Sequence, residues 1–189
     1  MILPTSYFPS ILYFKYLVKY KSISICSEEL YLKQTFRNRC EILGSNGIHK
    51  LSIPVERTMG SKSKTKEVLI SNVQNWRKDH WGAIESSYRT APYFHFYDKE
   101  IKELLDNTSD SLIDFNQTII NQFISWWDLP IDFIEKQDCL YNESINFLSR
   151  KKNLDYIQVF EDKLPFVSNL SVLDLLFCEG PMGRKWFLK

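Results

Sequence analysis

The run KQTFRNRC at residues 33–40 places three cations and two amides beside one aromatic residue and one cysteine. Guanidinium groups bind carboxylate and phosphate oxygens through two parallel hydrogen bonds, so this composition suits an anionic ligand such as a diphosphate. An exposed, solvated sheet face is the alternative interpretation, and the pattern leaves both open. The candidate binding residues of this run are Lys33, Gln34, Arg37, Asn38 and Arg39.

A second group of candidates lies in the run NVQNWRKDHWGAIESSYR at residues 72–89. His80 has an ordinary pKa of about 6.5, which suits general acid and base catalysis. Glu85 is the other candidate catalytic residue, although five helical positions turn it about 140° away from the histidine, so the two need not touch. Trp81 and Tyr88 are candidate substrate contacts. Alternatively, His80 packs between aromatic rings and hydrogen bonds a backbone carbonyl.

The run YFPS at residues 7–10 supplies two further candidates, Tyr7 and Ser10. A strand-to-helix turn here would aim backbone N–H groups outward at a helix N-terminus, which favours phosphate, whereas an ordinary N-cap is the alternative. Asn169 is likewise a candidate ligand contact, and either Asn169 or Ser171 can cap the last helix, with Asp174 opposing the dipole of that helix. The chain has no HExxH spacing and no GxSxG elbow, so we predict no metal and no cofactor.

Composition excludes several classes of protein. The chain has 189 residues, 44% of them hydrophobic, with 24 basic and 23 acidic residues and a net charge of +1. Because nucleic-acid binders usually carry a clear basic excess, we predict no nucleic-acid partner. The four cysteines form no CxxC pair. The apolar N-terminal stretch is interrupted by Pro4, Pro9 and Lys15, so we predict no signal peptide, no membrane span and a cytoplasmic protein.

The N-terminal half must position the first and third groups of candidates. The pattern predicts a buried strand that ends by Pro9, a helix that begins after Ser10, and a parallel strand at SISICS, which is a βαβ arrangement. Residues 35–55 predict a β-hairpin around the turn GSNG. Alternation along its first strand places Arg37 and Arg39 side by side on one face, with Gln34 and Asn38 on the opposite, more apolar face.

The second half reads as helical. A basic loop at residues 57–66 precedes a strand at EVLIS, and IDFIEKQ is a possible returning strand. We therefore expect an α/β protein in which residues 1–189 form a single domain, with a mixed sheet and hairpin in the N-terminal half and a predominantly helical C-terminal half. The expected helices lie within residues 72–89, 92–105, 110–127 and 172–179.

Several of these motifs occur in a characteristic order across nearly the whole chain. They are YFPSILYF, LKQTFRNRC with GSNGIHKLSIPV, HWGAIESSYRTAPYFHFY, LIDFN and NLSVLDLLFCEGP. Together they resemble the WbqC-like protein family, a bacterial family named after a member encoded with surface-polysaccharide (O-antigen) biosynthesis genes. One departure is the run LPFVS at residues 164–168, where the resemblance implies a Gly-Phe pair and a proline.

The resemblance implies a transferase that modifies an activated, nucleotide-linked sugar in surface-polysaccharide biosynthesis. His80 would then deprotonate an amine or hydroxyl of the sugar, while Arg37 and Arg39 hold its phosphates or a developing oxyanion. The expected partners are small molecules, an activated sugar and an acyl or aminoacyl donor. The alternative is a non-catalytic binding protein for a phosphorylated metabolite or an acidic partner segment. The sequence leaves donor, acceptor and oligomeric state open.

Overall fold

The N-terminal segment forms the predicted βαβ arrangement. The computed structural model describes residues 1–134, 147, 149 and 156–188. In it β1 (Ile2–Pro4) and β2 (Ser22–Cys26) pair in parallel and are joined by α1 (Ile11–Tyr20). The short β7 (Asp132–Phe133) pairs in parallel with the other edge of β2. The expected return strand at IDFIEKQ is therefore present in its first half, and residues 135–137 lie outside the described part of the chain.

The predicted hairpin is present but starts later than expected. It consists of β3 (Arg39–Gly44) and β4 (Gly47–Ser52), and Gly47 supplies the positive φ of 111° that the tight turn requires. The prediction that the first strand begins at Thr35 is wrong, because residues 33–38 form turns and Gln34 has a φ of 58°. Arg37 and Arg39 therefore do not share one face of a strand.

A second antiparallel pair follows, formed by β5 (Val55–Arg57) and β6 (Val68–Ile70). The basic loop between them contains two short 3₁₀ helices, η1 (Gly60–Lys62) and η2 (Thr65–Glu67). The strands of the described residues thus form three small sheets. The α/β class is confirmed, with its described strands distributed between separate sheets, because neither the β3–β4 hairpin nor the β5–β6 pair is joined to another of these strands.

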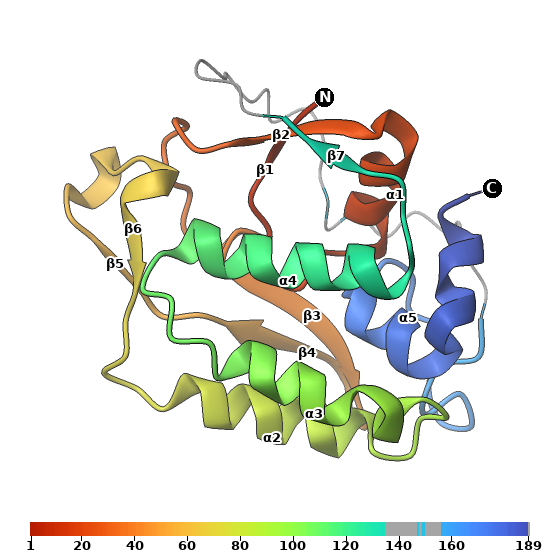
Figure 1. The fold of residues 1–189 in the computed structure, drawn as a ribbon. Coiled ribbons are helices and arrows are strands. Elements are labelled where there is room, and N and C mark those ends of the chain that lie inside the picture. The colour runs from red at the N-terminus through yellow and green to blue at the C-terminus, as the bar shows by residue number, and fades with distance from the viewer. Residues whose placement is uncertain (135–146, 148, 150–155, 189) are drawn as a thin grey trace.

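The helices follow the predicted order and layer around the hairpin (Figure 1). They are α2 (Trp76–Tyr88), α3 (Phe94–Leu105), α4 (Leu112–Trp126) and α5 (Val172–Glu179), the last continued by η3 (Gly180–Trp186). Ser111 caps α4 by accepting a hydrogen bond from the Asp114 N–H. In the described residues we find no helix with the length and apolar character needed to cross a bilayer.

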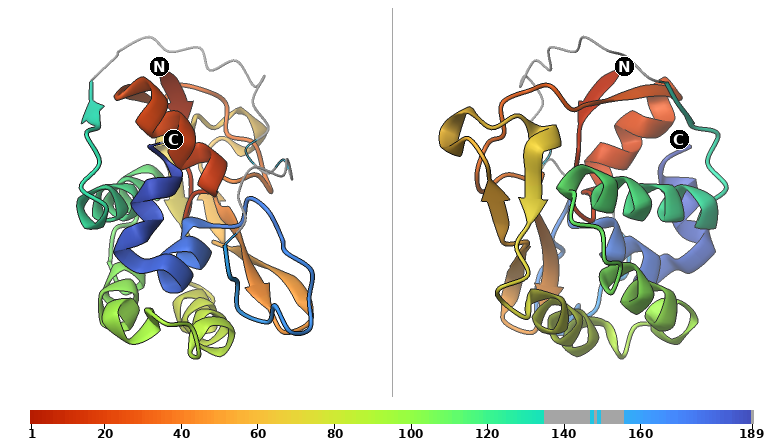
Figure 2. Two further views of the ribbon diagram at one scale, coloured as in Figure 1. Left: turned by 90° about the vertical axis from the view of Figure 1, so that its right-hand side faces the viewer. Right: turned by 60° about the vertical axis from the view of Figure 1, so that its left-hand side comes forward.

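The C-terminal segment interlocks with the N-terminal turn. The Ile11 N–H donates to the Leu170 carbonyl at 3.0 Å, and the Val172 N–H donates to the Pro9 carbonyl at 2.8 Å. The segment before α5 also runs beside the β3–β4 hairpin (Figure 2), where the Ser171 N–H donates to the Glu41 carbonyl. The turn at residues 5–10 therefore lies between β3, α2, α4 and the approach to α5.

Candidate functional site

A buried tyrosine and histidine meet at the centre of this arrangement. The Tyr7 hydroxyl and His80 Nδ1 are 2.8 Å apart, although 73 residues separate them in the sequence. Trp76, one helical turn before His80, lies edge-on to the imidazole with ring centroids 5.0 Å apart. Phe115 of α4 stacks on the other ring of the pair, Tyr7, at 6.2 Å. Aromatic packing therefore fixes both polar side chains.

Burial keeps this pair neutral. Desolvation lowers the His80 pKa to about 4, against a smaller opposing effect of a backbone hydrogen bond at Ser52. Because the bond at Ser52 favours the protonated form of His80, the imidazole is its donor and the Ser52 carbonyl its acceptor. The other ring nitrogen, Nδ1, then accepts the hydrogen bond from the Tyr7 hydroxyl. Desolvation also raises the Tyr7 pKa well above its ordinary value. At neutral pH the histidine is thus a proton acceptor already oriented by two hydrogen bonds.

Arg39 reaches the same centre through Ser52. Its Nε donates to Ser52 Oγ at 2.8 Å, and the two residues are opposite each other in the β3–β4 pair. Arg39 is half-buried, and no carboxylate of the described residues lies within ion-pair distance of it. It also lines a small hollow of about 10 Å³, roughly the space of one water molecule. Other residues lining this hollow include Ser6, Ser10, Glu41, Asn169 and Ser171.

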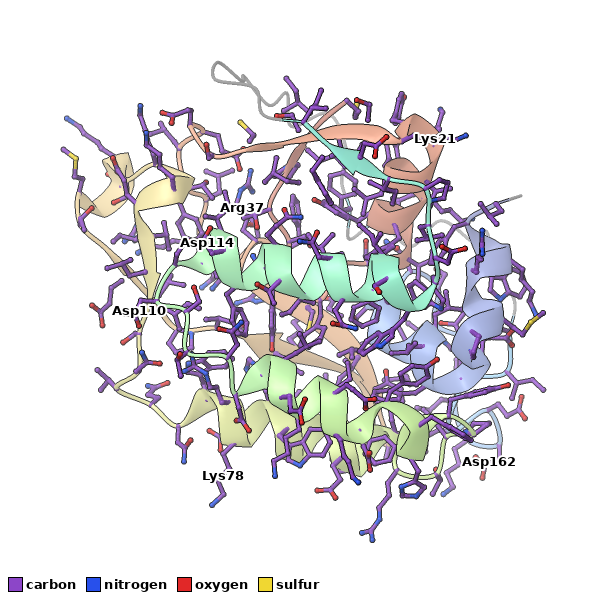
Figure 3. The ribbon with its side chains drawn as sticks, in the orientation of Figure 1. Lys21, Arg37, Lys78, Asp110, Asp114 and Asp162 are labelled. Atoms are coloured by element: carbon purple, nitrogen blue, oxygen red, sulfur yellow. The ribbon has the colours of Figure 1, made fainter. Side chains whose placement is uncertain are left out.

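Arg37 lies elsewhere and is committed to an ion pair. Its Nε and one terminal nitrogen donate to the two carboxylate oxygens of Glu29 at 2.7 and 2.8 Å, and the arginine is fully buried. Its carbonyl accepts a hydrogen bond from Asn116 Nδ2, so Arg37 lies beside the first turns of α4 (Figure 3). Lys33 and Gln34, the candidates at the start of the turn, are exposed. The expectation that Gln34 faces the apolar side is therefore wrong.

Ser10 and Asn169 hold the interlocked segments together. Ser10 is the N-cap of α1, because its Oγ accepts from the Tyr13 N–H while donating to the Phe147 carbonyl at 2.7 Å. Asn169 accepts from the Leu12 N–H at 2.8 Å and donates to the Phe147 carbonyl. Both residues border the hollow of Arg39. Their polar atoms thus bond to other parts of the fold, although both residues line the hollow of the candidate site.

The remaining candidates of α2 lie apart from His80. Trp81 stacks on Phe94 of α3 with ring centroids 6.1 Å apart. Glu85 is half-buried, and within the described part of the chain its carboxylate makes no hydrogen bond or ion pair. Tyr88 points toward α5, where its hydroxyl donates to Asp174 Oδ1 at 2.9 Å. The structure therefore brings together Tyr7, Ser10, Arg39, His80 and Asn169. Asn38 instead donates to the Ile53 carbonyl at 2.8 Å, and the other candidates lie outside this group.

Asp174 is the acceptor of a second buried polar cluster. Its carboxylate accepts hydrogen bonds from Tyr88, Tyr156 and Gln158, and it is fully buried. Desolvation raises its pKa, and the three hydrogen bonds oppose that effect. The Tyr88 hydroxyl also accepts the Leu43 N–H at 3.1 Å, so the cluster joins α2, α5 and β3. Asp174, which we expected only to oppose the dipole of the last helix, thus helps to connect α2, α5 and β3.

Replacing Tyr88 by phenylalanine should lower the free energy of unfolding by about 2 kcal/mol. The change leaves the buried Leu43 N–H and Asp174 Oδ1 without the hydroxyl that pairs with both. Urea denaturation followed by circular dichroism measures it, with the exposed Tyr20→Phe as the matched control. Equal midpoints for the two variants would contradict a structural role of this hydroxyl.

Of the buried polar residues that have an atom without a partner among the described residues, Trp76 and Asn116 are not among the candidates identified from the sequence. Trp76 Nε1, Asn38 Oδ1 and Asn116 Oδ1 are buried without a hydrogen-bond partner among the described residues. Asn116 Nδ2 donates to Thr5 Oγ1 at 3.0 Å, in addition to its bond with the carbonyl before Asn38. Extending the register from the Asn-Gly turn would have placed Ser52 opposite Arg39. Trp76 could have been identified because it lies one helical turn before His80 and therefore on the same face of α2. No neighbouring residue in the sequence indicates a role for Asn116.

Metal binding has no geometric support in the part of the chain that the structure describes. There, no three His, Cys, Asp or Glu side chains come together in a way that could hold an ion. The chemistry available at the Tyr7–His80 centre is instead proton transfer, hydrogen bonding and anion binding.

Comparison with known proteins gives one family. The model of the WbqC-like protein family matches residues 5–146, which include Tyr7, Arg39 and His80. The uncharacterized protein Rv1507c of Mycobacterium tuberculosis is 28% identical over 126 residues, which cover 66% of this chain and 54% of that protein. The chain thus spans about half the length of this curated relative. No solved structure matches the chain.

Proposed function

Because this chain belongs to the WbqC-like protein family, we propose that it is a transferase that modifies an activated, nucleotide-linked sugar in surface-polysaccharide (O-antigen) biosynthesis. The observation that carries this proposal is the hydrogen-bonded series Arg39, Ser52, His80 and Tyr7. It links a guanidinium without a carboxylate partner among the described residues to a neutral imidazole. These are the anion ligand and the proton acceptor that such a transfer requires.

In the proposed reaction, a sugar amine or hydroxyl attacks the carbonyl carbon of an acyl or aminoacyl donor. The new N–C or O–C bond forms and the donor's leaving group departs with its bonding electrons, while the Tyr7 hydroxyl takes the proton that the nucleophile loses and passes its own proton to His80 Nδ1. A phosphate beside Arg39 would also raise the His80 pKa, since a nearby negative charge favours the imidazolium. This substrate class is consistent with a cytoplasmic location.

Unpartnered buried atoms support a sugar as the ligand. Asn38 Oδ1 and Asn116 Oδ1 need donors, whereas Trp76 Nε1 needs an acceptor. The orientation of each amide is set by its nitrogen atom. Asn38 Nδ2 donates to the Ile53 carbonyl, and Asn116 Nδ2 donates to the Arg37 carbonyl. Sugar hydroxyl groups both donate and accept, so they match a mixed set of this kind better than an anion alone does.

A non-catalytic binding protein is the second candidate function, and the state of His80 favours it. The residue is 5% exposed, and a pKa of about 4 makes it a weak base in the free protein. A binding protein would use the same centre for a phosphorylated metabolite or an acidic partner segment without releasing a product. Calorimetric titration with UDP-glucose, followed by a product search with acyl and aminoacyl donors, separates the two functions.

We expect Arg39→Gln to weaken UDP-glucose binding at least tenfold, because a charge-assisted hydrogen bond to phosphate is lost. The matched control is Arg89→Gln, an exposed arginine of the C-cap of α2, which should bind as the wild type does. If Arg39→Gln binds with unchanged affinity while remaining folded, the anion lies elsewhere. Binding without product in the wild type would favour the second function.

A further inference from the structure

A cleft opens at the surface where the turn of the β3–β4 hairpin meets the C-terminal half of α2, which runs along the hairpin (Figure 1). It is lined by residues 44–50 of the hairpin and by Ser86 and Ser87 of α2. Its volume is about 490 Å³, within the range of about 300 to 1,000 Å³ that is typical of small-molecule sites. Ser45 and Asn46 at its rim are exposed, so a ligand can enter it from solvent.

The Ser87 hydroxyl, at the floor of this cleft, has no hydrogen-bond partner among the described residues. The residue is 4% exposed. The neighbouring Ser86, by contrast, donates to the Ala83 carbonyl at 3.0 Å. Buried hydroxyl groups normally have a partner, because an unpaired one costs free energy. Ser87 therefore offers a ligand both a donor and an acceptor.

His49 lies on the side of the hairpin that faces α2. It is opposite the buried Ile42 in the β3–β4 register, and directly opposed side chains project from the same face of a sheet. A Cβ atom placed on Gly44 would lie 3.8 Å from His49 Cβ and 3.9 Å from Ser87 Oγ. The glycine thus leaves space between the histidine and the Ser87 hydroxyl.

The residues around the cleft favour an anion that carries hydroxyl groups. None of the described lining residues is acidic, whereas Lys50 contributes an ammonium group. Its Nζ is 3.8 Å from a carboxylate oxygen of Glu41, which is longer than a hydrogen bond, so its donors are available to a ligand. The hydroxyls of Ser86 and Ser87 and the amide of Asn46 both donate and accept, which suits hydroxyl groups.

We propose that this cleft is a second ligand site, which binds a small oxyanion that carries hydroxyl groups, namely a sugar phosphate or a sugar acid. In this site Ser87 and His49 donate hydrogen bonds to the anionic group, and Lys50 adds positive charge. The cleft is separate from the Tyr7–His80 centre, because Ser87 follows His80 by seven residues, which is about 10 Å along the helix axis. The proposal therefore does not rest on the proposed function.

Glucose 6-phosphate, gluconate and neutral glucose are the probes, titrated calorimetrically into the wild type, Ser87→Ala and His49→Gln. We expect at least one of the two anions to bind the wild type, and to bind each variant about tenfold more weakly, as for one lost hydrogen bond to a charged group. The exposed Ser125→Ala and His95→Gln are the matched controls and should bind as the wild type does. The anion that binds more tightly identifies the ligand group as phosphate or carboxylate.

Three results of these titrations would overturn the site. They are an absence of binding of both anions to the wild type, unchanged affinity in both Ser87→Ala and His49→Gln, and equal affinity for glucose and the anions.

Gly44→Ala tests the position of the ligand without removing a polar group. The added methyl enters the space between His49 and Ser87, so the affinity should fall at least tenfold. Gly44 does not have a positive φ, and the nearest atom to the methyl is the Gly47 carbonyl oxygen at 3.4 Å, an ordinary contact, so the fold is kept. Gly82→Ala is the matched control, because an added Cβ there meets nothing within 4 Å. Wild-type affinity in Gly44→Ala would show that the ligand lies elsewhere.

Stability measurements separate ligand binding from a structural role of Ser87. Without ligand, Ser87→Ala should leave the thermal midpoint unchanged or raise it, because it removes a buried hydroxyl that lacks a partner among the described residues. With glucose 6-phosphate or gluconate, the midpoint should rise more in the wild type than in the variant. A lower midpoint of the ligand-free variant would show that the hydroxyl stabilises the fold and would overturn the proposal.

Crossed titrations distinguish this cleft from the site of the proposed function. Arg39→Gln should bind the anion as the wild type does, and Ser87→Ala should bind UDP-glucose as the wild type does. Loss of anion binding in Arg39→Gln, with none in Ser87→Ala, would place the anion at the Tyr7–His80 centre and overturn the second site. Anion binding that depends on Ser87, without UDP-glucose binding or product, would support the cleft and contradict the nucleotide-sugar function.

Discussion

Arg37→Ala is expected to lower the free energy of unfolding by about 3 to 5 kcal/mol, as for other buried ion pairs that lose one partner. The change leaves the Glu29 carboxylate, whose side chain is 10% exposed, without the two guanidinium hydrogen bonds that compensate its burial. Urea denaturation monitored by tryptophan fluorescence measures the loss. The exposed Arg89→Ala is the matched control and should change stability by less than about 1 kcal/mol.

A double variant tests the cause of that effect. Replacing both Arg37 and Glu29 by methionine removes the charges together, so stability should recover most of the loss seen for Arg37→Ala. If Arg37→Ala is instead as stable as the Arg89 control, the guanidinium does not maintain the fold. Arg37 would then return as a candidate ligand of the substrate anion.

The second large effect is a loss of stability on acidification, caused by His80. Its pKa in the folded protein is about 4, below the ordinary 6.5, so between these values the unfolded chain binds more protons. The contribution of neutral His80 to the free energy of unfolding is therefore complete above pH 6.5 and is lost as the pH falls toward 4. Linkage gives a decrease of about 2 kcal/mol between pH 7 and pH 5, approaching about 3 kcal/mol near pH 4.

Comparison with His80→Asn isolates this contribution. Asparagine can still accept the Tyr7 hydroxyl hydrogen bond but does not titrate, so its unfolding free energy should fall less between pH 7 and pH 5. The pKa of Asp174 is raised in the folded protein, so its contribution to the free energy of unfolding increases as the pH falls. This contribution is common to the wild type and to His80→Asn. His95→Gln, at an exposed position, should behave as the wild type does. Parallel profiles for wild type and His80→Asn would show that His80 does not carry the effect.

Local signals were sufficient to predict most of the fold. Ser10, Ser111 and Ser171 each cap a helix at a position where the sequence indicates a start. The Asn-Gly pair forms the hairpin turn with the expected positive φ at Gly47. These features depend on neighbouring residues alone, which is why periodicity and capping rules detect them.

The start of β3 could not be predicted in the same way. Alternation of polar and apolar residues through positions 35–42 fits a strand, but the Phe36 carbonyl accepts the Tyr7 N–H and Arg37 turns toward Glu29. Both partners are distant in the sequence, and their bonds override the local pattern. The same reasoning explains why Arg37 and Arg39, expected side by side, have different partners.

The candidate site was predictable by residue type and only in part by position. Tyr7, Arg39 and His80 were each identified, and the structure links them through Ser52. Glu85, Trp81 and Tyr88 are candidates because they share a helix with His80, yet Trp81 packs on α3 and Tyr88 bonds a residue of α5. Glu85 has no hydrogen bond or ion pair among the described residues. Which face of α2 meets Tyr7 depends on how α2 packs against β3 and α4.

The interlocked termini have a consequence for biosynthesis. The Phe8 carbonyl accepts the Ser171 hydroxyl from 163 residues away, and the backbone bonds beside it span similar distances. Closing so large a loop is slow and entropically costly. A growing chain therefore cannot complete the turn that carries Tyr7 until the segment up to Val172 has left the ribosome, and any activity at that turn begins only after that segment has been released.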